Sequence, residues 1–552
     1  MTRWFRKRRD AAPETTAAPV ASPEESPPAA DAVPDEAAHG RLPAGPVKWA
    51  YIMNWGQQGV TLLVSIVLAA ILGPRTYGIV ALAIIYIAFV QLVLDQGISQ
   101  TIVQKSDLDD DHLDSAFWLN LFWALLLVGA TLAISPWWAR ANGTPELEPV
   151  IDVLSVALLI QALTVVQQAV LRRQMKFKRL ALRSNVAALV GGVAAVILAL
   201  EGAGIWSLVA QRLIAAGVAL VLLWMVGGWV PRFRFSRPHA RSLLGFSVQT
   251  FAGNVAVFVN RRVDALLIGL FFGPAAVGLY RLADRLIESL LQIGTYPVQL
   301  FALSHFARLQ HQPGPLRRAV HSCVGLTALV TVPMMLVVFA CSSYIVDALG
   351  PRWKPAGDAL KLLAIVGIGK TVVAFTAALL IATSKPHLRA LMEWTFAAVS
   401  AAAFAGAALL LRGGATSDQV FGMATSRVAL FLGIFLPVNV FIVMRTTGLS
   451  LPKFLGTLRS PVLAGLVAIG AVLVVEKLGL LSAIGEATRG ERLARLVVAG
   501  TVACVAAGVA LLAVDRTHRA RASSVLRRGR RIWAGRPPDT RPAETGAIVT
   551  DA

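Results

Sequence analysis

The chain has 552 residues, of which 56% are hydrophobic and only 15% are charged. Because soluble globular domains carry about 25% charged residues, this composition excludes an ordinary soluble protein and indicates a polytopic helical membrane protein. The net charge of +21 is explained by basic loops beside an anionic lipid leaflet, so we expect no nucleic-acid partner. The three cysteines, Cys323, Cys341 and Cys504, have no metal or redox spacing, and we expect no metal site.

Residues 1–45 begin with the basic stretch MTRWFRKRRD and continue with Ala, Pro, Glu and Ser. No apolar segment follows the basic start, so it is not a secretory signal, and the composition predicts a disordered cytoplasmic tail. Apolar runs of about 18 to 25 residues then recur, each long enough to cross the bilayer as a helix. A basic C-terminal tail is expected at 516–552. The predicted spans number fourteen: 46–72, 77–95, 114–135, 149–171, 181–200, 203–229, 242–272, 277–301, 316–340, 356–382, 389–411, 419–444, 461–481 and 493–514.

The loops between these spans are basic mainly on one side. Since cytoplasmic loops carry an excess of Lys and Arg, this side is predicted to be cytoplasmic and to hold both termini. Its loops contain Lys105, Arg172, Arg173, Lys176, Lys178, Arg179, Arg183, Arg232, Arg234, Arg237, Arg241, Arg308, Arg317, Arg318, Lys385, Arg389, Arg445, Lys453 and Arg459. The opposite loops contain Arg75, Arg140, Arg352, Lys354, Arg412 and a small cluster between Lys477 and Arg495.

The sequence also repeats itself. A Gly-Pro-x-x-x-Gly segment follows the first span, at 73–78, and the seventh span, at 273–278, and Asn54 and Asn254 precede these segments at the same offset. These matches indicate that the second set of six spans is a copy of the first.

A second match links the sixth and twelfth spans, through AQR at 210–212 and TSR at 425–427. It places Arg212 and Arg427 at similar depth. Because six is an even number, the two copies share one orientation, which is a parallel repeat about an axis normal to the membrane. The last two spans lie outside the duplication.

Fourteen spans, a six-plus-six duplication and the paired Gly-Pro-x-x-x-Gly turns resemble the Wzx-type polysaccharide flippases. These belong to the polysaccharide transport branch of the multidrug/oligosaccharidyl-lipid/polysaccharide (MOP) exporter superfamily. The segments ISQTIVQKSDLDDDHLDSAFWLNLFWALLL and VLRRQMKFKRLALRSNVAAL are also similar to that branch. The resemblance covers roughly residues 46–445. It implies two six-helix bundles, at 46–230 and 242–445, facing each other across a central cavity, with two additional helices at 460–515.

The resemblance implies a transporter and not an enzyme, with no catalytic residues and no cofactor. Family members move undecaprenyl-pyrophosphate-linked oligosaccharides across the bacterial cytoplasmic (inner) membrane for exopolysaccharide, O-antigen or capsule biosynthesis. A proton or sodium gradient is a candidate energy source for such a cycle. The implied partners are the polyprenyl-pyrophosphate-linked oligosaccharide, anionic membrane lipids, and a polymerase and other polysaccharide assembly proteins.

The seventh and eighth spans, NRRVDALLIGLFFGPAAVGLYRLADRLIESLLQ, place charged residues between apolar ones. A central Arg in lipid costs about 2.5–3.5 kcal/mol, so we expect these side chains to face a wet cavity, with some charges paired. A diphosphate head group needs cations, and guanidinium groups offer planar paired donors to phosphate oxygens. Alternatively, Arg281–Asp284 and Arg261–Asp264 could be helix-stabilising pairs, or some arginine side chains could extend to an interface. The candidate cavity cations are Arg261, Arg262, Arg281, Arg285, Arg212, Lys370 and Arg427.

Uncharged and acidic residues in the same spans are the second group of candidates. The carboxylates could couple transport to an ion gradient, although pairing with Arg is the favoured interpretation. The amides suit sugar hydroxyls, with interhelical hydrogen bonding as an equal alternative. The candidates are Asn54, Gln57, Gln58, Asn254, Asp264, Asp284 and Glu288.

Two motifs do not support an enzyme. AIVGIGKT at 364–371 fits a loose phosphate-loop pattern, but it lies inside an apolar span rather than between a strand and a helix. SDLDDDHLD at 106–114 is acidic, and we interpret it as a solvated turn whose acids favour the start of the next helix. Two alternatives stay open: a flippase for the peptidoglycan precursor lipid II, and a membrane polysaccharide polymerase or ligase.

Overall fold

The computed structural model describes residues 44–514 except for 96–98, 100–101, 103–108, 227–228, 235, 482 and 486–487. Apart from Ala44 and Gly45, the two predicted tails lie outside the described residues. Every regular element in the described part of the chain is a helix, and no strand occurs there. The predicted all-α fold is therefore confirmed.

The helices follow one another as antiparallel hairpins joined by short turns. The N-terminal half contains α1 (Ala44–Leu72), α2 (Pro74–Asp95), α4 (Asp110–Ala141), α5 (Leu147–Leu154), α6 (Val156–Arg173), α7 (Phe177–Leu200) and α8 (Ile205–Val226). The C-terminal half contains α9 (Arg237–Phe272), α10 (Pro274–Arg308), α11 (Pro313–Leu349), the short 3-10 helix η2 (Pro351–Trp353), α12 (Ala356–Val373), α13 (Thr376–Ala382), α14 (Pro386–Leu410), α15 (Thr416–Leu430), a π-helical turn (Phe431–Phe435) and α16 (Leu436–Thr447). The last two helices are α17 (Leu451–Lys477) and α18 (Arg489–Val514).

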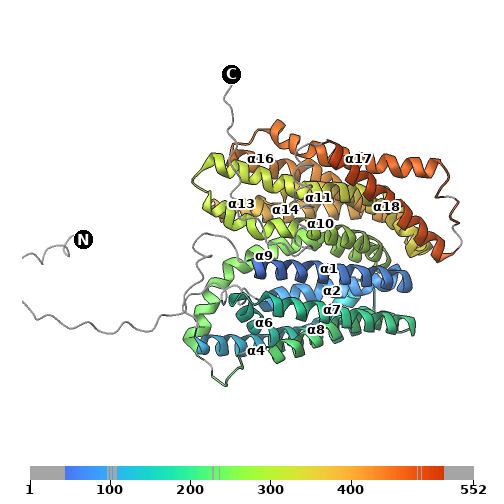
Figure 1. The fold of residues 1–552 in the computed structure, drawn as a ribbon. Coiled ribbons are helices and arrows are strands. Elements are labelled where there is room, and N and C mark those ends of the chain that lie inside the picture. The colour runs from blue at the N-terminus through green and yellow to red at the C-terminus, as the bar shows by residue number, and fades with distance from the viewer. Residues whose placement is uncertain are drawn as a thin grey trace, which may run out of the picture.

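The two halves lie against each other as separate layers (Figure 1). Equivalent helices have equivalent neighbours, since α1 packs on α7 in the first half as α9 packs on α14 in the second. The last two helices pack on each other and on α11. The halves are joined between α8 and α9, and α9 begins at Arg237, inside the gap predicted between 230 and 242. The predicted domain bounds stay a prediction.

Twelve helical segments in the described part of the chain are long and apolar enough to cross a membrane. They do not include α9 and α10, which are the charged seventh and eighth spans, although these helices are 36 and 35 residues long. Both run alongside the other helices in the same bundle (Figure 1). The expected fourteen crossings therefore stay a prediction, because apolarity alone does not identify these two.

The acidic segment before α4 starts that helix, as expected. Asp109 is the N-cap, and its side chain accepts a hydrogen bond from the backbone N–H of His112 at 2.9 Å. Asp110 and Asp111 occupy the first turn, where negative charge is favourable for the helix dipole.

Both Gly-Pro-x-x-x-Gly segments form the same turn. Gly73 and Gly273 have φ values of 79° and 81°, a left-handed conformation that favours glycine. Pro74 and Pro274 then occupy the first positions of α2 and α10, where a missing N–H leaves no helical hydrogen bond unmade. The predicted repeat is thus present in the backbone.

The second glycine of each segment brings the two halves into backbone contact. A Cβ on Gly78 would overlap the carbonyl group of Pro274, and a Cβ on Gly278 would overlap that of Pro74. The two helices thus cross through their first turns in a reciprocal contact, at the end of the molecule opposite the basic loops. We call this contact the glycine crossing.

A tryptophan of the second half strengthens this closure. The indole N–H of Trp353, in η2, donates to the carbonyl oxygen of Ala69 in α1 at 2.9 Å. Its ring lies edge-on to that of Tyr77 in α2, with 5.9 Å between the centroids. The face opposite the basic loops is therefore closed by contacts between the halves.

We expect Gly278→Ala to destabilise the closed arrangement, because its Cβ would meet a backbone carbonyl that has no room to move aside. Overpacking of this kind costs about 1–3 kcal/mol. The purified variant should show a lower apparent Tm. A cysteine introduced at Ser65 in a cysteine-free background should also react faster with an impermeant reagent added from the closed face. Gly129→Ala is the control, since that helical glycine has open space around its Cβ position. Equal Tm and labelling in the two variants would contradict the crossing.

Candidate substrate cavity

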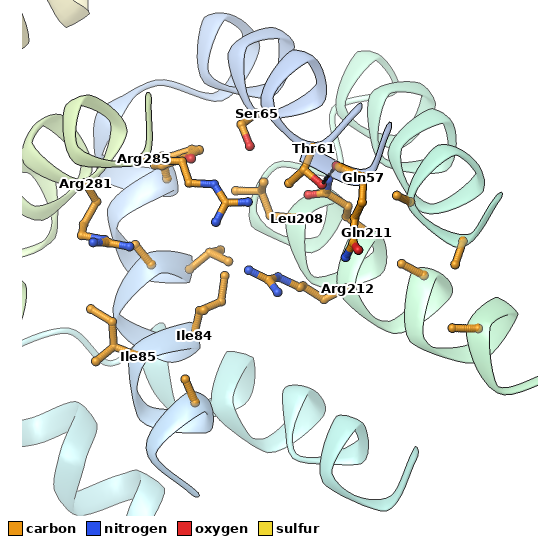
Figure 2. Close-up of a pocket in the computed structure, with 18 of the residues that line it drawn as sticks. Gln57, Thr61, Ser65, Ile84, Ile85, Leu208, Gln211, Arg212, Arg281 and Arg285 are labelled. Carbon is orange, nitrogen blue, oxygen red and sulfur yellow. Dashed lines mark hydrogen bonds between the residues drawn. The ribbon is translucent and has the colours of Figure 1, made fainter. Parts of the chain in front are cut away.

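A cavity of about 290 Å³ lies on the inner side of the N-terminal half. Helices α1, α2, α7 and α8 form most of its wall, and α9 and α10 of the C-terminal half close it. Ala81, Ile84, Ile85 and Ala88 of α2 form much of the apolar part of the wall. Figure 2 shows the cavity with its polar side chains.

Five arginines line the cavity, and no aspartate or glutamate is among its lining residues: Arg183, Arg212, Arg262, Arg281 and Arg285. The guanidinium groups of Arg212 and Arg285 turn into the same space (Figure 2). Because two arginines come from the N-terminal half and three from the other, both halves supply the positive charge. The arrangement can bind an anion with several oxygens.

Four of these five arginines have no ion-pair partner. In the part of the chain that the structure describes, no carboxylate lies within ion-pair distance of Arg183, Arg212, Arg262 or Arg285. Arg281 is different: it is only 9% exposed and pairs with Asp284 one turn further along α10. Uncompensated cations in a partly enclosed site at membrane depth are costly, and an anionic ligand would offset this cost.

Hydroxyl and amide groups lie on the α1 and α8 side of the cavity, contributed by Gln57, Thr61, Ser65 and Gln211. The hydroxyl of Thr61 donates to the carbonyl oxygen of Gln57 at 2.7 Å. Of the predicted uncharged candidates only Gln57 lines the cavity. This side can contact neutral polar groups such as sugar hydroxyls.

Arg427, predicted as a cavity cation, is placed elsewhere. Its guanidinium group pairs with Asp264, which is fully buried, and donates to the hydroxyl of Tyr280 at 3.3 Å. The Tyr280 hydroxyl itself donates to Asp264 at 2.7 Å. The three side chains join α15, α9 and α10 in one buried network outside the cavity lining.

The repeat explains why Arg212 and Arg427 differ. At the offset of 200 residues between Gly73 and Gly273, the first-half position equivalent to Asp264 is Val64. The first half thus has no carboxylate to neutralise Arg212, which stays exposed to the cavity.

Arg261, Lys370 and Glu288 form a further group beside the cavity. Arg261 lies 3.8 Å from Glu288, and its side chain is 65% exposed. Glu288 also interacts electrostatically with Arg262, Arg281 and Lys370. Neither Arg261 nor Lys370 lines the cavity. The sequence alternative of an Arg261–Asp264 pair is not what forms, because Asp264 is taken by Arg427.

The remaining predicted residues lie outside the lining. Gln58 donates to the side chain of Gln292, which ties α1 to α10 across the two halves. Asn254 is half-buried, and the side-chain oxygen of Asn54 is buried without a partner. The contact of Gln58 with Gln292 matches the interhelical alternative considered for the amides.

Several lining residues were not predicted. Arg183 was assigned to a basic loop, but it lies in the second turn of α7, and its Nε donates to the carbonyl oxygen of Ala219 at 3.1 Å. Thr61 and Ser65 follow Gln57 at steps of four residues, so they share a face of α1. That spacing was a usable signal. The described residues contain no cluster of three or more metal-ligating side chains.

Fold and family are shown by comparison with known proteins. A lipid II flippase, MurJ, in an inward closed conformation superposes with a TM-score of 0.62 over 83% of this chain and 97% of its own, at 12% identity. A multidrug resistance MATE family transporter in an inward-facing conformation superposes with a TM-score of 0.51 over 71% of this chain and 96% of its own, at 15% identity. The chain therefore has the fold of the MOP superfamily transporters.

Residues 67–358 match the family described as polysaccharide biosynthesis protein, and the chain belongs to this family. The succinoglycan biosynthesis transport protein ExoT of Rhizobium meliloti is 28% identical over 58% of this chain and 65% of ExoT. The teichuronic acid biosynthesis protein TuaB of Bacillus subtilis is 26% identical over 54% of this chain and 63% of TuaB. The lipopolysaccharide biosynthesis protein WzxC of Escherichia coli is 22% identical over 59% and 67%.

The matched parts thus span just under two thirds of ExoT and TuaB. At the level of family and fold, the resemblance predicted from the sequence is confirmed. The chain is a multi-pass membrane protein.

We expect Asp264→Asn to destabilise the protein, because it leaves the guanidinium group of Arg427 buried without a counter-charge. Breaking a buried pair in this way costs about 3–5 kcal/mol. The double variant Asp264→Leu/Arg427→Met should recover much of this loss, since it removes both charges. Apparent Tm of the purified variants measures the effect. Arg75→Gln, at the exposed pair of Arg75 with Glu146, should change Tm little. A double variant no more stable than Asp264→Asn would contradict the pairing.

Proposed function

We propose that this protein moves an undecaprenyl-pyrophosphate-linked oligosaccharide from the cytoplasmic to the outer leaflet of the bacterial cytoplasmic membrane. The diphosphate and the first sugar occupy the cavity while the lipid tail stays in the bilayer. The product serves exopolysaccharide, O-antigen or capsule biosynthesis, with a polymerase and other assembly proteins acting afterwards. Both termini lie in the cytoplasm, as the basic loops predict.

The single observation that carries this proposal is the set of five arginines in a cavity with no lining carboxylate. A diphosphate presents several charged oxygens, which match guanidinium groups arriving from both halves. The cavity volume of about 290 Å³ is near the lower limit of small-molecule sites, roughly 300–1,000 Å³. It suits a head group rather than a whole oligosaccharide, and the hydroxyl and amide side of the wall suits the adjoining sugar.

The glycine crossing supports a route by alternating access. It closes the face opposite the basic loops, so in this conformation the cavity loads from the basic, cytoplasmic side. Movement of α2 against α10 at the crossing then exposes the arginines to the other face. Anionic lipids around the basic loops would bring negatively charged substrate to the same side.

Lipid II is the second candidate substrate, favoured by the superposition on MurJ. It carries the same diphosphate, so the arginines do not distinguish the two. Membership in the polysaccharide biosynthesis family favours a polysaccharide precursor. Failure of the chain to restore growth in cells depleted of their lipid II flippase would support that choice.

A proton or sodium gradient is the proposed energy source. The three carboxylates considered for coupling, Asp264, Asp284 and Glu288, all lie beside arginines, which stabilise the ionised form. Sodium dependence, or inhibition by a protonophore in proteoliposomes, identifies the ion.

Arg212→Gln and Arg285→Gln should each slow translocation about tenfold or more, because each removes a charged hydrogen bond to phosphate. The measurement is leaflet-resolved detection of the lipid-linked sugar in proteoliposomes. Tm should be nearly unchanged, since neither guanidinium group has an acidic partner to lose.

Arg75→Gln is the matched control, because it removes the same charge from an exposed pair away from the cavity. Normal translocation by both cavity variants, with the control also normal, would contradict a diphosphate site in this cavity.

A further inference from the structure

Glu288 is the least firmly held of the three carboxylates that accompany the arginines of α9, α10 and α15. The side chains of Asp264 and Asp284 are 1% and 7% exposed, and each is in direct contact with its arginine. The side chain of Glu288 is 24% exposed, and its ion-pair partner Arg261 lies 3.8 Å away, beyond ordinary hydrogen-bond length. Glu288 is thus a partly exposed carboxylate whose pairing with Arg261 is loose.

Glu288 lies 3.8 Å from Arg261 of α9 and also interacts electrostatically with three further cations, Arg262 on α9, Arg281 on α10 and Lys370 on α12. Two of them, Arg262 and Arg281, also line the cavity. Glu288 itself is not a lining residue. It therefore acts on the cavity through the arginines that it shares with any bound anion.

We propose that Glu288 is a resident counter-ion that competes with the diphosphate for these arginines. The inference rests on the proposed function and concerns the regulation of the same site. While the site is empty, Glu288 offsets part of the positive charge. When a diphosphate arrives, Arg262 turns to its oxygens and Glu288 keeps Arg261 and Lys370, while Arg281 stays paired with Asp284.

A transport site benefits from such competition. Binding must be favourable enough to load the site and weak enough to empty it. Several arginines with no carboxylate nearby would hold a diphosphate too firmly for release. A nearby carboxylate lowers the affinity in every state in which it faces the arginines, and it takes them back as the anion leaves.

The position of Glu288 links this exchange to the contact between the halves. One turn further along α10, Gln292 accepts the hydrogen bond from Gln58 of α1. The indole N–H of Trp55 donates to the carbonyl oxygen of Ile293 at 3.1 Å. Loss of the interaction between Glu288 and Arg262 would thus occur beside the hydrogen bonds that join α1 to α10.

The test measures binding of inorganic pyrophosphate to the purified full-length protein by calorimetry, at constant pH and several salt concentrations. Glu288→Gln should bind pyrophosphate about tenfold more tightly than wild type, because a negative charge that interacts with the cavity arginines is removed. Its salt dependence should be steeper. Its translocation of lipid-linked sugar should be slower. Tighter binding with slower turnover is a combination that simple loss of structure does not produce.

Two variants serve as controls. Glu288→Asp keeps the charge and should bind as wild type. Glu393→Gln removes a carboxylate of α14 that accepts a hydrogen bond from Asn260 at 3.3 Å and does not line the cavity. It should leave pyrophosphate affinity unchanged.

The outcomes separate the two proposals. If wild type binds pyrophosphate and Glu288→Gln binds it equally or more weakly, the counter-ion role is wrong and the cationic site stands. If wild type does not bind pyrophosphate and Arg212→Gln translocates normally, the proposed function fails, and the competition with it.

Discussion

Every charge in the core of this protein must be offset, because a guanidinium group at membrane depth has neither water nor counter-ions unless the fold supplies them. The structure meets this constraint in two ways. Arg427 is neutralised by Asp264 inside a buried network. Arg212 and Arg285 are left without an acidic partner, but they face a cavity. The first arrangement holds helices together. The second leaves a site that an anion would complete.

The duplication shows how equivalent helices of the two copies, α2 and α10, can have the same backbone turn and different charges. At the shared offset, the α10 residues Arg281, Asp284, Arg285 and Glu288 correspond to Ala81, Ile84, Ile85 and Ala88 of α2. The backbone turn is retained in both copies, since it depends on Gly and Pro, whereas the charges are present in one copy only. The apolar α2 copy forms the wall against which the arginines of α10 are presented. The asymmetry between two similar halves therefore creates a cavity with a charged and an uncharged side.

Local signals in the sequence predicted the fold well. Apolar runs, the acidic start of α4 and the paired Gly-Pro turns each depend on residues close together in the chain. The site was predicted less well, because its geometry depends on which partner each charge meets. Spacing along α9 suggested Arg261 with Asp264, but Arg427 of α15, 163 residues further along the chain, takes Asp264. Arg183 was missed because a basic loop and the first turns of a helix look alike in sequence.

Helix α10 contributes both to the glycine crossing and to the lining of the cavity. Gly278 fixes α10 against α2 through a backbone contact, and the charged residues follow within the next three turns. At about 1.5 Å of rise per residue, Arg281 lies about 5 Å from the crossing, Arg285 about 10 Å and Glu288 about 15 Å. A tilt of α10 about Gly278 would therefore move Glu288 about three times as far as Arg281. Opening at the crossing would thus change the distances between Glu288 and the arginines of α9. Access to the cavity from the closed face and neutralisation of these arginines by Glu288 therefore cannot vary independently.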